Sequence, residues 1–131
     1  MVNRIFFLGI SIIFATPCAA LAKPRSIKIS SITVEKTGLY EPGRTPQPEI
    51  ESACRNFSAT DKTVSAWLNH SKEVSEIKYF SENIITNCTA TGTLIAQNGL
   101  RYNWVIDLGG SAVIYNEEKK TKIYLIGKEL Y

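Results

Sequence analysis

The chain has 131 residues, of which fifteen are Lys or Arg and twelve are Asp or Glu, and its formal net charge is +3 at pH 7. So weak a positive charge argues against a nucleic-acid ligand or a strongly anionic membrane surface as the partner. The length allows one small domain, and we expect no second domain.

The first residues have the pattern of an export signal. Arg4 supplies a positive charge, residues 5–15 form an apolar run, and Ala20-Leu21-Ala22 supplies the small-x-small site before the expected cleavage. We therefore predict a signal peptide over 1–22 and a single domain over 23–131. That domain would reside in the periplasm or outside the cell, free of the membrane after cleavage.

Two other interpretations of this segment remain open. An uncleaved anchor would need roughly 18 to 20 apolar residues to span a bilayer, and the run is shorter than that. A lipid anchor at Cys18 would require cleavage directly after Pro17, which is a poor residue at that position.

The cysteines predict one disulfide bond. Cys18 leaves with the signal, and the remaining pair, Cys54 and Cys88, would join in an oxidising compartment. Because these two residues are far apart in the sequence, we expect a structural bond rather than a redox-active one.

The first element after the signal is a strand over 27–36, because apolar and polar residues alternate there. The alternation changes phase at Ser30 and Ser31, and a bulge at these serines would bring the apolar residues to one face. Residues 37–49 contain three prolines and two glycines, so we expect a long loop.

A helix over 61–72 follows, with its start marked by Thr60 and its apolar face by the spacing of Val64, Trp67 and Leu68. Residues 74–80 fit either a helix end or an extended connection.

From residue 89 the pattern predicts an antiparallel meander, with strands over 89–96, 101–108, 112–115 and 122–126. Asn98 and Gly99 would be the two turn residues of the first hairpin, which places Ile95 opposite Tyr102. We expect the helix to cover the apolar face of this sheet, with Trp67 packing on the row that contains Trp104. The strand over 27–36 could pair at either edge.

The predicted fold class is therefore α+β: an antiparallel β-meander with one packed helix and one disulfide.

No constellation of catalytic residues is evident. His70 is the one histidine, the two cysteines are expected to be bonded to each other, and Ser111 lacks the surrounding pattern of a nucleophile elbow. We predict no catalytic residue, no metal site and no cofactor. A small cell-envelope hydrolase, the alternative, would need His70, Glu73 or Glu76 in a cleft.

Tyrosines are the chain's best candidates for contacts with another protein, since tyrosine buries a large area at little entropic cost. Tyr40 lies in the proline-rich segment and Tyr115 in the meander.

Scattered positions over residues 54–126 resemble a group of small exported bacterial proteins, some of which look like immunity proteins. The positions that carry the resemblance are Cys54-Arg55-Asn56-Phe57, Thr60-Asp61, Trp67, Cys88, Gly92, Trp104-Val105-Ile106 and Gly110. The resemblance implies a binding protein whose partner is a toxin or an envelope hydrolase.

Residues 110–115 and 124–129 are also similar to a loop pair in periplasmic lysozyme inhibitors of the C-type family. This similarity implies that Ser111, Tyr115 and Lys128 lie together on one exposed rim. The order of the small residues around Ser111 and the expected helix both depart from that family's pattern.

Our expectation from the sequence is thus a secreted or periplasmic, non-enzymatic binding protein of the immunity type. Its candidate partner-binding residues are Tyr40, Ser111, Tyr115 and Lys128. The alternatives are a lysozyme inhibitor and a small hydrolase.

Overall fold

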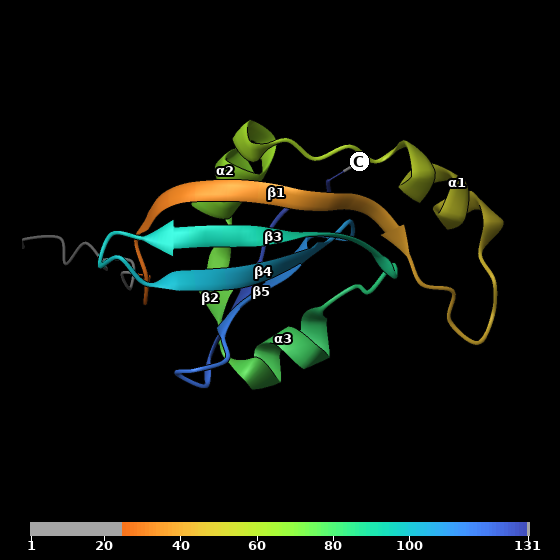
Figure 1. The fold of residues 1–131 in the computed structure, drawn as a ribbon. Coiled ribbons are helices and arrows are strands. Elements are labelled where there is room, and N and C mark those ends of the chain that lie inside the picture. The colour runs from red at the N-terminus through yellow and green to blue at the C-terminus, as the bar shows by residue number, and fades with distance from the viewer. Residues whose placement is uncertain (1–24, 131) are drawn as a thin grey trace, which may run out of the picture.

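The computed structural model describes residues 25–130, so the export signal predicted over 1–22 lies outside the described residues. Residues 25–130 form an α+β fold in which one antiparallel sheet of six strands is flanked by three helices (Figure 1). The strand order is β1-β3-β4-β5-β6-β2. The elements are β1 Ile29–Tyr40, α1 Pro48–Asn56, α2 Asp61–His70, β2 Lys72–Val74, α3 Glu76–Glu82, β3 Cys88–Ala96, β4 Arg101–Asp107, β5 Ser111–Asn116 and β6 Thr121–Ile126.

Strands β3 to β6 form the predicted meander, and their alternating residues build the core on one face of the sheet. Large apolar side chains on this face are at most 5% exposed. They are Leu94, Tyr102, Trp104, Ile106, Ile114, Ile123 and Leu125. The indole of Trp104 lies over Gly92, its partner across the β3–β4 ladder, and its Nε1 donates to the carbonyl oxygen of Thr93 at 2.9 Å.

Helix α2 covers this apolar face, as the sequence predicts. Its N-terminus is fixed by a capping box, in which the Thr60 hydroxyl accepts from the amide of Thr63 and the Thr63 hydroxyl accepts from the amide of Thr60. Trp67 and Leu68 belong to the same cluster as Trp104, so the expected packing is confirmed. The helix ends at His70, two residues before the predicted end.

Strand β1 pairs with β3 and forms one edge of the sheet. The pairing shifts register between Ile29 and Ser31, which is the bulge that the serines predict, and Ile29, Ile32 and Val34 all pack against the core. The strand continues to Tyr40, well into the segment predicted as a loop.

The predicted register of the β3–β4 hairpin is wrong by one residue. Leu94, rather than Ile95, lies opposite Tyr102. Three residues instead of two form the turn, because the amide of Ala96 donates to the carbonyl oxygen of Leu100 and Gly99 has a left-handed φ of 84°. This is the three-residue hairpin with a glycine bulge, and it leaves Ile95 on the opposite face with 45% of its surface exposed.

The expectation of a single packed helix is also too low, because α1 and α3 accompany α2. Helix α1 begins at Pro48, inside the segment expected to be a loop, and the disulfide between Cys54 of α1 and Cys88 of β3 joins this helix to the sheet. Both cysteines are fully buried. The predicted bond is therefore confirmed, and it holds α1 against the sheet.

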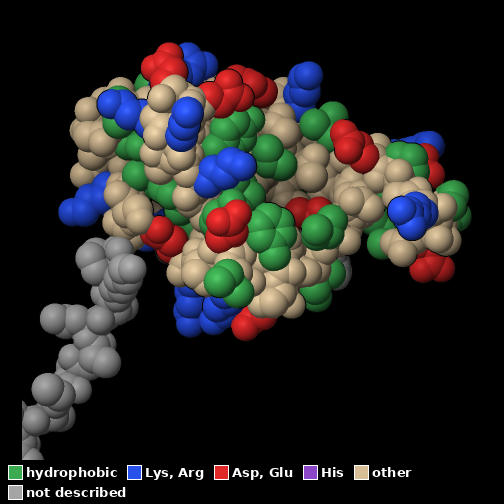
Figure 2. All heavy atoms as spheres, turned by 90° about the horizontal axis from the view of Figure 1, so that it is seen from below, with side chains coloured by type: hydrophobic (Ala, Val, Ile, Leu, Met, Phe, Trp, Pro, Cys, Tyr) green, Lys and Arg blue, Asp and Glu red, His purple; other side chains and the backbone are tan. Residues whose placement is uncertain are grey.

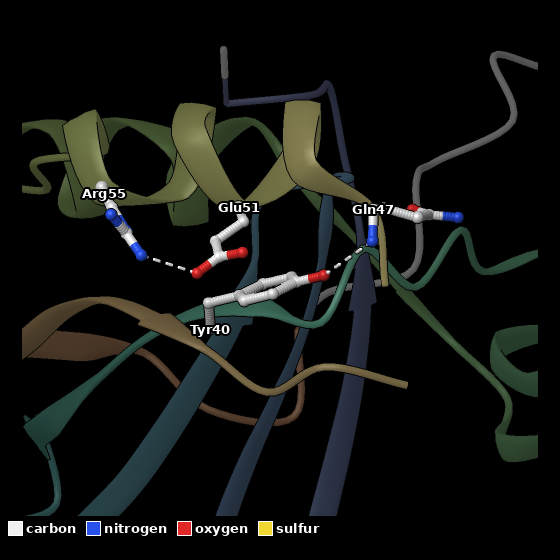
Figure 3. Close-up of polar contacts among 4 residues, drawn as sticks. All are labelled: Tyr40, Gln47, Glu51 and Arg55. Carbon is white, nitrogen blue, oxygen red and sulfur yellow. Dashed lines mark hydrogen bonds and ion pairs between the residues drawn. The ribbon is translucent and has the colours of Figure 1, made fainter. Parts of the chain in front are cut away.

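Tyr40, a predicted partner-binding residue, lies beneath α1 (Figure 3). Its hydroxyl accepts a hydrogen bond from the amide of Gln47 at 3.4 Å, and its ring packs against the disulfide cluster. Above the ring, Arg55 and Glu51 form an exposed ion pair at 2.7 Å (Figure 3). The observed contacts of Tyr40 thus hold the end of β1 against α1.

Candidate protein-binding surface

Helix α3 lies on the side of the sheet opposite to α2, where a small aromatic cluster attaches it to β6 (Figure 1). Tyr79 points inward, and its ring centroid lies 4.9 Å from that of Tyr124. The hydroxyl of Tyr124 donates to Oε1 of Glu76 at 3.1 Å. Burial raises the pKa of Tyr124, and the hydrogen bond to the Glu76 carboxylate raises this pKa further.

The outer side of α3 and the residues after it expose four large hydrophobic side chains. Ile77 is 84% exposed, Phe80 65%, Ile84 62% and Ile85 62%. We call these four residues the apolar patch. Figure 2, which views the molecule from the side of α3, shows hydrophobic side chains spread over this face among charged and other side chains. Apolar clusters that stay exposed on a folded domain are typical of protein-binding sites.

A buried carboxylate fixes the segment that carries Ile84 and Ile85. Asp107, at the end of β4, is 8% exposed. It accepts hydrogen bonds from the amide and the hydroxyl of Thr86, and from the amide of Gly109. The patch is therefore held in place by the sheet at both ends, through Tyr124 and through Asp107.

We expect Asp107→Ala to lower the free energy of unfolding by about 2 kcal/mol, because it leaves partly buried donors of Thr86 and Gly109 without an acceptor. Denaturant unfolding measures this loss, and hydrogen exchange at the Thr86 amide should become faster. Asp107→Asn, which keeps one acceptor oxygen, is the matched control and should cost less. Equal stability of Asp107→Ala and the wild type would contradict this account of the segment.

The structure brings together only two of the four predicted partner-binding residues. Ser111 and Lys128 line one hollow of about 290 Å³. Tyr115 lies on the same strand as Ser111 but about 13 Å further along it, and Tyr40 lies under α1. The other residues that line the hollow are Glu82, Asn83, Ile84, Gly109, Gly110, Ile126, Gly127 and Glu129.

The expectation that Ser111, Tyr115 and Lys128 share an exposed rim is wrong for Ser111. That residue is 2% exposed, because it begins β5 directly after the glycine turn and faces the segment 126–129. Lys128 is exposed and Tyr115 is half-buried.

Two of the three residues named for the hydrolase alternative, Glu73 and Glu76, accept hydrogen bonds from side chains of the fold. Glu73 accepts hydrogen bonds from the amide and the hydroxyl of Ser26, and Glu76 accepts from Tyr124. His70 is exposed, and its Nδ1 lies 2.7 Å from the carbonyl oxygen of Ala66 in its own helix. None of the three lines the hollow that contains Ser111.

Within residues 25–130, no group of three or more His, Cys, Asp and Glu side chains is placed to hold a metal ion. No helix of this part of the chain is long and apolar enough to cross a membrane.

Ile77, Phe80, Ile84 and Ile85 are not among the partner-binding residues predicted from the sequence. The sequence did contain an indication of this exposed pair, because Ile84 and Ile85 stand between polar residues outside any strand pattern. Whether such a pair is buried depends on tertiary packing, which periodicity does not give.

No protein-family model, curated protein or solved structure matches this chain. The two resemblances drawn from the sequence therefore stay predictions.

Proposed function

We propose that this protein is a non-enzymatic binding protein that acts after export and neutralises another protein, as an immunity protein does. The observation that carries the proposal is the apolar patch of Ile77, Phe80, Ile84 and Ile85, which is exposed yet held firmly by the sheet. A partner that covered these side chains would gain the free energy of their burial without having to order them first.

Two further observations support this function. The disulfide between Cys54 and Cys88 is consistent with an oxidising compartment. Two acidic residues near the patch have partners within the fold, since Glu76 accepts a hydrogen bond from Tyr124 and Asp107 accepts from Thr86 and Gly109. The buried position of Ser111 weighs against the lysozyme-inhibitor alternative, which depends on an exposed rim.

The test is capture of the partner by the folded, disulfide-bonded protein from the envelope fraction of the cells that make it. We expect the wild type to capture a toxin or hydrolase and to inhibit its activity in a purified assay. The variant Phe80→Ser/Ile84→Ser should lose both properties, because it replaces two of the four apolar side chains of the patch.

Ile95→Ser is the matched control, since Ile95 is an exposed hydrophobic residue on β3, outside the patch. It should capture and inhibit like the wild type, and circular dichroism should show all three proteins folded. Equal inhibition by the wild type and the patch variant, or capture of no protein by the wild type, would overturn the proposal.

A further inference from the structure

The side of the sheet opposite to α2 is uncovered over most of its width. Residues directly opposite each other in an antiparallel ladder have their side chains on the same face of the sheet. Trp104 and its partner Ile114 lie in the core beneath α2, so the residues that alternate with them point to the other side. Among the helices of residues 25–130, α3 alone lies on that side, and its main strand contact is β6 (Figure 1). Strands β1, β3, β4 and β5 therefore present a surface that no helix of this part of the chain covers, and Figure 2 looks onto it.

Two rows of side chains run across these strands, and the registers of the ladders define them. We call the residues of the two rows the open face. The first row, from β1 to β6, consists of Thr33, Thr93, Asn103, Tyr115 and Lys122, and the second of Lys36, Thr91, Val105, Val113 and Tyr124. In the middle of the rows, Val105, Val113 and Tyr115 are half-buried. The open face thus includes Tyr115, a partner-binding residue predicted from the sequence.

The apolar patch continues the second row of the open face. Val105 and Val113 are neighbours in this row, and Val113 pairs with Tyr124. The ring centroid of Tyr124 lies 5.9 Å from that of Phe80, which belongs to the patch and is 65% exposed. The patch and the open face are therefore joined through these two rings, and a partner seated on the patch would lie beside Val113.

The charged residues of the open face are both lysines. Lys36 stands at the β1 end of the second row and Lys122 at the β6 end of the first row, and both are exposed. The four strand spacings between β1 and β6 put them roughly 20 Å apart. Arg101, at the hairpin end of β4, is an exposed cation beside the first row. None of these three cations forms an ion pair with another residue of 25–130.

Few carboxylates offset this positive charge. The two rows contain no Asp and no Glu. Glu76 accepts a hydrogen bond from Tyr124, and the turn over 117–120 contains two Glu and two Lys, so it has no formal net charge. Glu35 stands at the register shift next to Lys36, outside the two rows. The open face is therefore an uncharged, partly apolar middle between cations that have no partner in this part of the chain.

These charges argue against a second copy of the chain as the occupant of the open face. In a symmetric dimer the same surface of both copies meets, so the cations of one copy would oppose those of the other. Like charges that face each other across an interface repel. A protein surface that carries apolar side chains between carboxylates fits the open face instead.

We propose that the open face receives an acidic surface of the bound protein, with apolar side chains over Val105 and Val113 and carboxylates near Lys36 and Lys122. This inference rests on the proposed function, because Phe80 of the apolar patch continues the open face. It names the chemistry of the partner, whereas the patch gives only its apolar contacts.

The first test uses synthetic peptides, so that it does not depend on the partner. An acetylated and amidated eight-residue peptide of alternating Leu and Glu should shift the NMR amide signals of Thr91, Val105 and Val113 in a saturable way. The matching peptide of Leu and Lys should not. Lys36→Glu/Lys122→Glu should bind the acidic peptide about tenfold more weakly, because both attractive charges become repulsive. Added salt should weaken binding by the wild type.

Arg44→Glu/Lys62→Glu is the matched control, since it changes the net charge equally at two exposed residues, one in the loop after β1 and one on α2. It should bind the acidic peptide like the wild type, and circular dichroism should show both variants folded. Equal shifts with the Leu-Lys peptide, no saturable shift with the acidic peptide, or equal weakening by the two double variants would overturn the inference.

Sedimentation of the wild type alone tests the other occupant. We expect a monomer, because the open face repels a second copy. A dimer that Val113→Asp dissociates would mean that a second copy covers the open face, and this result would overturn the inference.

The two proposals fail in different ways. If the patch variant loses the partner while Lys36→Glu/Lys122→Glu captures it as fast as the wild type and the acidic peptide does not bind, the open face has no such role and the proposed function stands. If the acidic peptide binds the open face but the wild type captures no protein, the preference of this face for acidic groups stands and the proposed function falls.

Discussion

Replacing Cys54 and Cys88 together by alanine is expected to lower the free energy of unfolding by about 3 to 4 kcal/mol. The bond joins residues 34 apart in the sequence, and closing a loop of that length removes a large part of the conformational entropy of the unfolded chain. For a domain whose total stability is about 5 to 10 kcal/mol, this is a large share. Urea unfolding with and without a reductant measures the loss.

The variant itself provides the control, since a reductant should shift the midpoint of the wild type to that of the variant and leave the variant unchanged. In the double alanine variant, the backbone amides of α1 should lose more protection from hydrogen exchange than those of α2, because Cys54 bonds α1 to β3 in the wild type. A wild type whose midpoint does not move, although a thiol assay counts both cysteines as free, would contradict this role of the disulfide.

Gly92→Ala should destabilise the fold by more than about 3 kcal/mol, or prevent folding. A Cβ at this position would overlap the carbonyl oxygen of Thr33 on β1 and the indole of Trp104 on β4, with Cε2 of that ring at 2.7 Å. Neither neighbour can move cheaply, since Thr33 is part of the β1–β3 ladder and Trp104 is fully buried. Thermal and denaturant unfolding measure the effect.

Gly43→Ala is the matched control for this substitution. Gly43 lies in the loop between β1 and α1, where the nearest atom to a new Cβ is Nδ2 of Asn87 at 3.4 Å. The change should alter stability by no more than about 0.5 kcal/mol. If both alanine variants unfold at the same denaturant concentration, the close packing around Gly92 does not make a Cβ at this position destabilising.

The parts of the fold that local patterns encode could be predicted from the sequence. The meander follows from the alternation of residues, and α2 follows from the cap at Thr60 and the spacing of Trp67 and Leu68. The disulfide follows from the count of cysteines together with the predicted export signal.

The parts that failed depend on geometry that the same residue types leave open. Pro48 suggested a loop, yet proline is favourable at the first position of a helix, which is where it stands in α1. Asn98 and Gly99 fit a two-residue turn and a three-residue turn equally well. The three-residue turn, which the structure has, places Leu94 in the core in place of Ile95.

The candidate site was the least predictable part. Ser111 and Lys128 were chosen from a resemblance, and the structure does bring them to one hollow, but Asn83 and Ile84 reach it through the end of α3. Periodicity does not tell which helix end meets which turn, because that contact depends on how Tyr79 packs against Tyr124.

The strand order has a consequence for how the chain acquires its shape. Strands β3 to β6 are neighbours in sequence as well as in space, so each hairpin among them closes a short loop. Strand β1 instead finds β3 across the two intervening helices α1 and α2, the strand β2 and the helix α3. Closing a long loop costs more entropy than closing a short one, so we expect the meander to form first and β1 to join it as a late step.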